Sequence, residues 1–223
     1  MRNVTSLIIG CLSVCVSLAA NAQSTSSERV KEIIASRCAV CHGPDGESAS
    51  AVYPRLAAQR PDYLAKQLRD FRDGRRKSDT MSGMAADLKE EDILGLALFF
   101  SSKKTTARQA GDADLAAVGK YIFQRGNSYS GVPACATCHG LNGHGTQQLP
   151  RLAGQHPSYV EVQLKEFDQR ERNNDNAIMH SVASKLTALE TRAVAVFIGS
   201  LQSRSVGGDD GIVVRKPGCA RGV

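Results

Sequence analysis

The sequence predicts an all-α protein built from two similar domains in tandem. Apolar residues recur at the three- and four-residue spacing of a helix in several stretches, and no stretch shows the two-residue alternation of a β-strand. The chain also contains a repeated segment, "PRLAAQRPDYLAKQLRDF" at 54–71 and "PRLAGQHPSYVEVQLKEF" at 150–167, in which 10 of 18 positions are identical. A repeat of this length indicates one folding unit that occurs twice.

The first half is expected to contain three main helices. Ser27 can cap the first helix. The apolar residues of that helix form one continuous stripe, namely Val30, Ile33, Ile34, Cys38 and Cys41. The second helix begins at Pro61, which suits a first helical turn, and runs to 71. An apolar third helix spans 93–100.

The second half is expected to repeat this order. Helical spacing appears at 115–122 and is followed by an inserted loop, "GNSYSGVPA". A helix then covers 157–167, and an apolar helix covers 193–201. Thr187 and Glu190 form a capping box before this last helix.

Residues 1–22 have the pattern of a secretory signal peptide. Arg2 supplies the positive start, a short apolar region follows, and "ANA" at 20–22 is a small-x-small cleavage site. The apolar run is short for a membrane span, which needs roughly 20 residues. A lipid-attachment box ending at Cys11 is an alternative, but it would leave almost no apolar region before the cysteine. We therefore expect export to the periplasm.

The repeat and the composition divide the chain into five parts. They are the signal peptide at 1–22, a first domain at 24–102, a linker at 103–110, a second domain at 111–203 and a flexible tail at 204–223. The tail contains Cys219, which has no evident partner and is expected to be a tolerated free thiol.

A cysteine–histidine motif occurs in both halves, as "CAVCH" at 38–42 and "CATCH" at 135–139. Residues three and four apart share one face of a helix, so each motif can present two thiols and an imidazole to one flat ligand. C-x-x-C-H is the pattern of covalent c-type haem attachment. The sequence therefore predicts two haem c groups.

The cofactor-binding residues that follow from this motif are the four thiols of Cys38, Cys41, Cys135 and Cys138. A redox dithiol or a zinc site is the alternative for a C-x-x-C pair. Zinc, however, needs four ligands, and a dithiol does not need the histidine that follows in both copies.

Four residues are predicted to be the axial iron ligands, namely His42, Met81, His139 and Met179. The two methionines lie 39 and 40 residues after their respective histidines, in segments rich in Asp, Asn, Ser and Gly that we expect to be loops. Met84 has no counterpart in the second half and is expected to pack beneath the haem edge.

Histidine coordination is the alternative in the second half, because His180 adjoins Met179. The first half has Ser82 at that position, so the repeat favours methionine. The remaining histidines, His144 and His156, are expected to lie on the surface.

The charge pattern excludes a nucleic-acid-binding protein. The chain has 28 Lys and Arg against 22 Asp and Glu, a formal net charge of +6, but its basic residues are scattered. The one dense basic cluster, at 72–77, also contains Asp73 and Gly74 and is expected to be a solvated helix end.

These motifs, the repeated "PRLA" segments, the loops "MSGMAADL" and "MHSVASKL" and the exported N-terminus together resemble the cytochrome c4 family over about 28–201. The resemblance implies two cytochrome c-like domains, each wrapped around a covalently bound haem, with the propionate edges facing across the junction. It also implies that Pro54 and Pro150 offer carbonyls to the ligating histidines, and that Arg55 and Arg151 pair with propionates.

The resemblance further implies electron delivery at the inner membrane, between a quinol-oxidising complex as donor and a terminal oxidase as acceptor, with possible loose membrane association. An iron ligated on both faces by His and Met leaves no position for a substrate, which describes a carrier rather than an enzyme. The alternatives are the cytochrome subunit of a flavocytochrome-type sulfide dehydrogenase and a di-haem peroxidase, which would need an open iron position.

Overall fold

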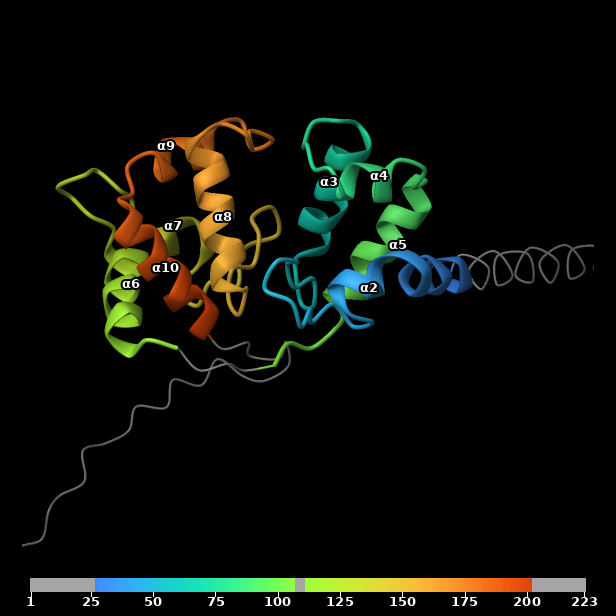
Figure 1. Cartoon of the computed structure of the whole chain (residues 1–223), viewed down its shortest axis with the longest axis horizontal. Helices are drawn as coiled ribbons and strands as arrows, with labels where there is room; N and C mark the ends of the chain where they lie inside the picture. The colour runs from blue at the N-terminus through green and yellow to red at the C-terminus, as the bar shows by residue number, and fades with distance from the viewer. Residues whose placement is uncertain (1–26, 107–110, 202–223) are drawn as a thin grey trace, which may run out of the picture.

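The computed structural model describes residues 27–106 and 111–201, which form two helical bodies joined end to end (Figure 1). We call them the first domain (27–106) and the second domain (111–201). Within these ranges the structure contains no β-strand, and its one isolated bridge joins Asn127 and Val132. The predicted all-α fold is confirmed. The signal peptide, the linker residues 107–110 and the tail from 202 lie outside the described residues.

The first domain begins with helical residues 27–33, which continue into a π-helix, η1 (Ile34–Cys38), and then α2 (Ala39–His42). Its other helices are α3 (Pro61–Arg72), α4 (Met81–Ala85) and α5 (Glu90–Ser101). Ser27 is itself helical, so the prediction that it caps the first helix is wrong.

The second domain contains α6 (Ala113–Arg125), α7 (Cys135–His139), α8 (Pro157–Asp168), α9 (Ile178–Ala183) and α10 (Ala188–Ser200). The predicted capping box at the start of α10 is present, with the Glu190 amide donating to Thr187 Oγ1 at 3.2 Å. The inserted loop before α7 is closed by the bridge between Asn127 and Val132.

Each domain has its own apolar core. In the first, α5 packs on α3, and in the second, α10 packs on α6 and α8. The N-terminal and C-terminal helices of each domain cross closely, at Val30 and Gly95 in the first domain and at Gly119 and Ala193 in the second. Each domain therefore closes its own bundle around its cysteine–histidine motif.

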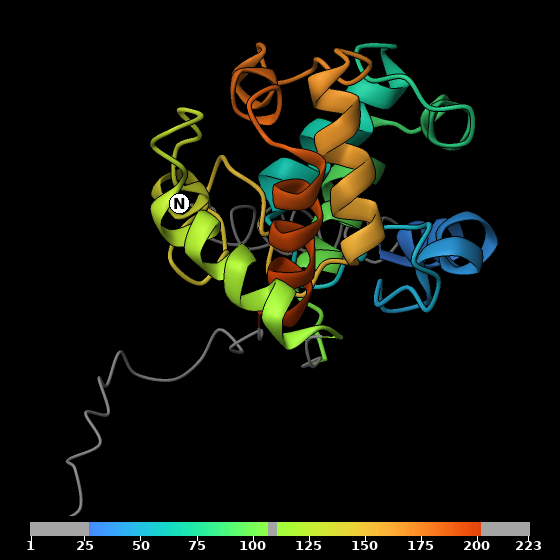
Figure 2. The ribbon, with the colours of Figure 1, turned by 60° about the vertical axis from the view of Figure 1, so that its left-hand side comes forward.

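The two domains meet along α3 and α8, which face each other in Figure 1, and α8 lies in front of α3 in Figure 2. Two glutamines join the domains by reciprocal bonds. The Gln59 side chain accepts from the Arg151 amide at 2.7 Å and donates to its carbonyl at 2.8 Å. The Gln155 side chain accepts from the Arg55 amide at 2.9 Å and donates to its carbonyl at 3.0 Å. The repeat thus produces a junction of near two-fold symmetry.

Candidate haem sites

One continuous cavity of about 2450 Å³ extends through both domains. Sites for a single small molecule usually measure about 300–1,000 Å³, so this space can hold more than one large ligand. Both cysteine–histidine motifs line it, as do Met81, Met84 and Met179. The structure therefore brings all the predicted site residues of each half to one space.

In the first domain, the π-helical turn and α2 carry Cys38, Cys41 and His42 to the cavity. A π-helical turn inside an α-helix often marks a functional position. The His42 side chain is buried, and its Nδ1 lies 2.8 Å from the Pro54 carbonyl oxygen. Because a carbonyl can only accept, Nδ1 carries the proton and Nε2 keeps a lone pair that can bind a metal.

The second domain repeats this arrangement on α7. His139 is buried, and its Nδ1 lies 3.0 Å from the Pro150 carbonyl oxygen. Burial lowers the pKa of both His42 and His139, and the bond to the proline carbonyl offsets only part of this effect. Both imidazoles therefore favour the neutral form, which is the form that binds metals.

Cys38 and Cys135 lack the lowered pKa of an attacking thiol in a redox dithiol. Burial raises the pKa of Cys38 and raises that of Cys135 to about 11. A reactive dithiol instead needs a lowered pKa, because the thiolate is the nucleophile. Nor do three His, Cys, Asp or Glu side chains converge on a metal position anywhere in the described parts of the chain. The described residues therefore favour neither an attacking thiol at Cys38 or Cys135 nor a zinc site.

Met81 and Met179 are half-buried and line the cavity, but they lie in short helices rather than in the loops we predicted. Met81 opens α4, where its amide donates to Ser78 Oγ at 3.1 Å. Met179 lies in the first turn of α9, where its amide donates to Asp175 Oδ2 at 2.6 Å. A side-chain acceptor before each methionine thus satisfies one amide of the first helical turn.

His180 does not line the cavity. Its Nδ1 lies 3.0 Å from the Phe167 carbonyl oxygen, and Arg170 Nε donates to its Nε2 at 3.2 Å. Both ring nitrogens are thus bonded to protein groups. Met84 lines the cavity but is 43% exposed.

Two buried arginines lie at the junction of the domains, on the cavity wall. Arg55 donates through Nη1 to the Gly154 carbonyl and through Nη2 to His156 Nδ1 at 3.1 Å. In Arg151, Nε and Nη2 are buried without a hydrogen-bond partner, and burial lowers the pKa of its guanidinium. A buried cation with free donors fits an acidic ligand group, such as a haem propionate.

His156 is buried at the junction, so the expectation that it lies on the surface is wrong. Its Nε2 lies 2.9 Å from the Ser48 carbonyl oxygen of the other domain. His144 is half-buried. The residue of the first half that matches His156 is Arg60, so the two halves differ at this position.

A second pair of arginines at the junction was not predicted. Arg172 donates to Gln163 Oε1 at 2.6 Å and to Tyr63 OH at 2.9 Å, across the junction. Arg76 donates to both Gln67 Oε1 and Gln163 Oε1 at 2.7 Å. The basic cluster at 72–77 is therefore not simply a solvated helix end.

The sequence signal for this pair was the repeat itself, which matches Arg76 with Arg172 and Gln67 with Gln163. Both guanidiniums also lie over phenyl rings, at 4.6 Å from the Phe71 centroid and 4.5 Å from the Phe167 centroid.

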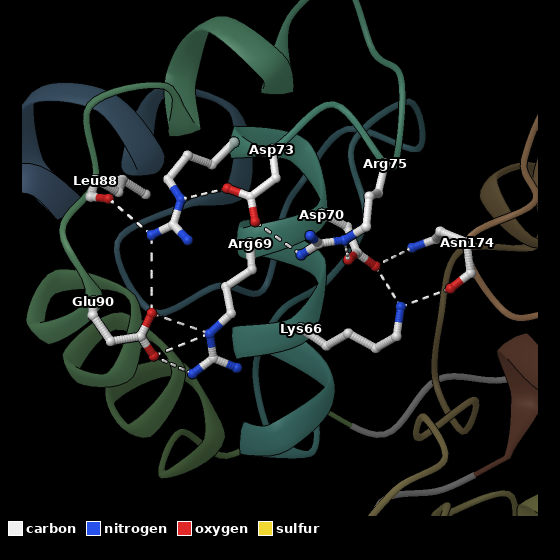
Figure 3. Close-up of polar contacts among 9 residues, drawn as sticks. Lys66, Arg69, Asp70, Asp73, Arg75, Leu88, Glu90 and Asn174 are labelled. Carbon is white, nitrogen blue, oxygen red and sulfur yellow. Dashed lines mark hydrogen bonds and ion pairs between the residues drawn. The ribbon is translucent and has the colours of Figure 1, made fainter.

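Asp70 forms a further link between the domains (Figure 3). It is 3% exposed and accepts bonds from Lys66, from Arg75 Nε at 2.8 Å and from Asn174 Nδ2 of the second domain at 2.6 Å. Burial alone would raise the pKa of Asp70, but these bonds outweigh it, and the pKa lies below its usual value. Asp70 is therefore an ionised group that ties the two domains together.

Comparison with known proteins decides the family. The model of the cytochrome c family matches residues 27–126 and 116–202, once for each half. Cytochrome c4 of Pseudomonas aeruginosa is 39% identical over 168 residues, which cover 74% of this chain and 83% of that protein. The chain belongs to the cytochrome c4 family.

Two further relatives extend this result. The crystal structure of reduced recombinant cytochrome c4 from Pseudomonas stutzeri matches with a TM-score of 0.73 and 35% identity, covering 80% of this chain and 98% of that one. A protein of Thiomonas intermedia named thiosulfate dehydrogenase electron acceptor is 38% identical over 171 residues, which cover 74% of this chain and 79% of that protein.

This cytochrome c4 homologue thus consists of two cytochrome c domains and carries two covalently bound haem c groups. It is an electron carrier. Among the described residues, no helix has the length and apolar character needed to cross a membrane.

Proposed function

We propose that this protein is a periplasmic di-haem cytochrome that carries single electrons between membrane-bound respiratory complexes. Its donor is a quinol-oxidising complex, and its acceptor is a terminal oxidase. The observation that supports this role best is the pairing, within one cavity, of a buried neutral histidine with a methionine in each domain. An iron ligated on both faces can exchange electrons but cannot bind a substrate.

The haem-binding residues are part of the same proposal. Cys38 and Cys41 form the thioether bonds in the first domain, and Cys135 and Cys138 form them in the second. The axial ligand pairs are His42 with Met81, and His139 with Met179. Each haem, when bound, supplies an iron that alternates between the ferric and ferrous states.

The protein groups around each site then have separate tasks. The carbonyls of Pro54 and Pro150 fix the tautomer of the ligating histidines and raise their basicity. The guanidiniums of Arg55 and Arg151 neutralise acidic groups at the junction. Ligation of the iron by a methionine sulfur raises the reduction potential of the haem. A closed, rigid site changes little in shape during electron transfer.

Met179 is preferred to His180 as the second axial ligand in the second domain for two reasons. Met179 lines the cavity, whereas both ring nitrogens of His180 are bonded to other protein groups. Ligation by His180 would require the loss of its bonds to the Phe167 carbonyl and to Arg170. Met81 has no histidine beside it in the first domain.

The signal peptide at 1–22 supports the periplasmic location, because covalent haem attachment in bacteria follows export. The domain bounds of 24–102 and 111–203 and the linker at 103–110 belong to the same proposal. Loose association with the membrane surface belongs to the same proposal.

A second donor is supported by one of the relatives. The Thiomonas intermedia protein carries the name thiosulfate dehydrogenase electron acceptor, and its similarity extends over both halves of this chain. A sulfur-oxidising dehydrogenase, of the thiosulfate type or the flavocytochrome sulfide type, is therefore the alternative donor.

The test uses the purified, reduced holoprotein. It is mixed with membranes that contain a terminal oxidase, and the haem absorption bands are followed over time. We expect reoxidation that stops when the oxidase is inhibited by cyanide, while protein without membranes stays reduced. Failure to reoxidise, combined with rapid reduction of the oxidised protein by thiosulfate and its dehydrogenase, would assign it to sulfur oxidation.

A further inference from the structure

His156 is one position at the junction where the two repeated segments differ in chemistry. The repeat places it opposite Arg60, so an imidazole in one half corresponds to a guanidinium in the other. His156 belongs to the second domain, but the two side-chain partners described for it, Ser48 and Arg55, belong to the first. His156 therefore connects the second domain to the haem site of the first domain.

The bonds of His156 fix its protonation. Nε2 lies 2.9 Å from the Ser48 carbonyl oxygen, which can only accept, so Nε2 carries a proton. Nδ1 lies 3.1 Å from Arg55 Nη2, which can only donate, so Nδ1 keeps its lone pair. Both bonds together require the neutral Nε2–H tautomer.

The Ser48 bond leads directly to the cysteine–histidine motif of the first domain. Ser48 is 1% exposed, and its amide donates to the His42 carbonyl at 2.8 Å. Its hydroxyl donates to the Cys41 carbonyl at 3.2 Å. His156 thus supports the turn that follows the motif as well as the guanidinium of Arg55.

Arg60 does not reproduce this contact in the other half. An arginine cannot accept a hydrogen bond, so it cannot hold Arg151 as His156 holds Arg55. Arg60 instead acts on Arg151 as a neighbouring cation, and its Nε is buried without a partner. One junction arginine is held by a neutral acceptor, whereas the other lies near both the carboxylate of Glu47 and a second cation, Arg60.

We propose that His156 is a positioning residue by which the second domain holds Arg55 and so sets the reduction potential of the first haem. This inference rests on the proposed function, in which Arg55 neutralises acidic groups beside that haem. A fixed cation near the haem opposes the extra positive charge of the ferric state. Loss of the bond between His156 and Arg55 should therefore lower the reduction potential of the first haem and leave that of the second haem unchanged.

The test compares His156→Leu with His156→Gln in the holoprotein. Leu removes both bonds at similar volume, whereas Gln retains a donor and an acceptor. Haem-methyl NMR resonances, followed through a redox titration, report the oxidised-to-reduced ratio of each haem separately. For His156→Leu we expect that ratio to rise roughly three- to tenfold for the first haem, or about 30–60 mV. The change for His156→Gln should be smaller.

Two control variants separate positioning from general loosening of the junction. Ser158→Ala removes an interdomain bond to the Ala51 carbonyl, 3.0 Å long, from the same helix without touching an arginine. It should leave both ratios unchanged. Arg60→His alters the matched position and should leave the first haem unchanged. If it shifts the first haem as much as His156→Leu does, the proposal is wrong.

The tautomer gives a readout that is independent of potential. In protein with ¹⁵N-labelled histidine at pH 7, His156 should show a protonated Nε2 and an unprotonated Nδ1. An imidazolium, an Nδ1–H tautomer, an unchanged first haem in His156→Leu, or equal shifts of both haems would overturn the proposal. The mass and spectrum of the same sample report two covalent haems separately, so a failure of the proposed function is recognised independently.

Discussion

The two domains achieve the same close helix crossing with glycine on opposite helices. In the first domain Gly95 lies on the C-terminal helix, where an added Cβ would come within 2.5 Å of Val30 Cγ2. In the second, Gly119 lies on the N-terminal helix, where an added Cβ would come within 1.9 Å of the Ala193 carbonyl oxygen. The fold thus requires a small residue at the crossing but does not fix which helix provides it.

The two crossings differ in what a larger residue would meet. At Gly95 the obstacle is a side chain, which can be shortened by mutation. At Gly119 it is backbone, which no substitution removes. The crossing holds each bundle closed around its haem site, so the tolerance of each domain to mutation should follow this difference.

The largest effect is expected for Gly119→Ala. The added methyl group would overlap the Ala193 carbonyl, and the helices would have to separate. We expect a loss above about 4 kcal/mol in the unfolding free energy of the second domain. Calorimetry should show the transition of this domain displaced or missing while that of the first persists. Ala193→Gly should not restore it, and restoration would contradict the backbone clash.

A smaller effect is expected for Gly95→Ala. Its methyl group meets the end of the Val30 side chain, so overpacking should cost about 1–3 kcal/mol in the first domain. The double variant Val30→Ala/Gly95→Ala should recover most of this loss by removing the colliding methyl groups. Urea unfolding followed by circular dichroism measures both. A double variant no more stable than Gly95→Ala would refute the side-chain explanation.

The junction should respond similarly to changes on either side of its near two-fold axis. Gln59→Leu and Gln155→Leu each leave the backbone amide and carbonyl of a buried arginine without their partner. We expect each to weaken domain docking by about 1–3 kcal/mol. Small-angle X-ray scattering and hydrogen exchange at the junction report the docking. Strongly unequal effects would show that one glutamine carries the junction.

The smallest effect is expected from Asp70, where the halves again differ because the matched residue is Glu166. The pKa of Asp70 is lowered in the folded protein, so its stabilising contribution is present above the unfolded value of about 3.9. That contribution should be lost as the pH falls through the lower, folded value. Asp70→Asn should flatten the acid limb of the stability curve, measured by urea unfolding at a series of pH values. Equal acid limbs for Asp70→Asn and the unmodified protein would contradict this role.

Much of the fold could be predicted from local sequence. Apolar spacing and prolines located the main helices, and the capping box at Thr187 located the start of α10. The C-x-x-C-H motif and the matched methionines led to residues that share one cavity. These features could be predicted because each is determined by a short segment of the sequence.

The remainder depended on contacts between distant segments. The short helices at Met81 and Met179 each contain an amide that donates to a side chain just before the helix, Ser78 or Asp175, and apolar spacing does not reveal these bonds. The burial of His156 depends on the other domain, about a hundred residues away in sequence. From local sequence, polar residues in a repeated segment are predicted to be exposed. Their burial depends on the partner domain, which local sequence does not show.

The far-red sulfur-to-iron absorption band of the oxidised protein tests the central claim, two closed sites with His and Met ligands, most directly. The account predicts the band at full two-haem intensity. Met179→His should halve it and leave the spectrum of the first domain unchanged, because the ligand sets are local. Met84→Leu, which nearly conserves volume, should keep the band. A band untouched by Met179→Leu, or an oxidised protein that is already partly high-spin, would contradict the account.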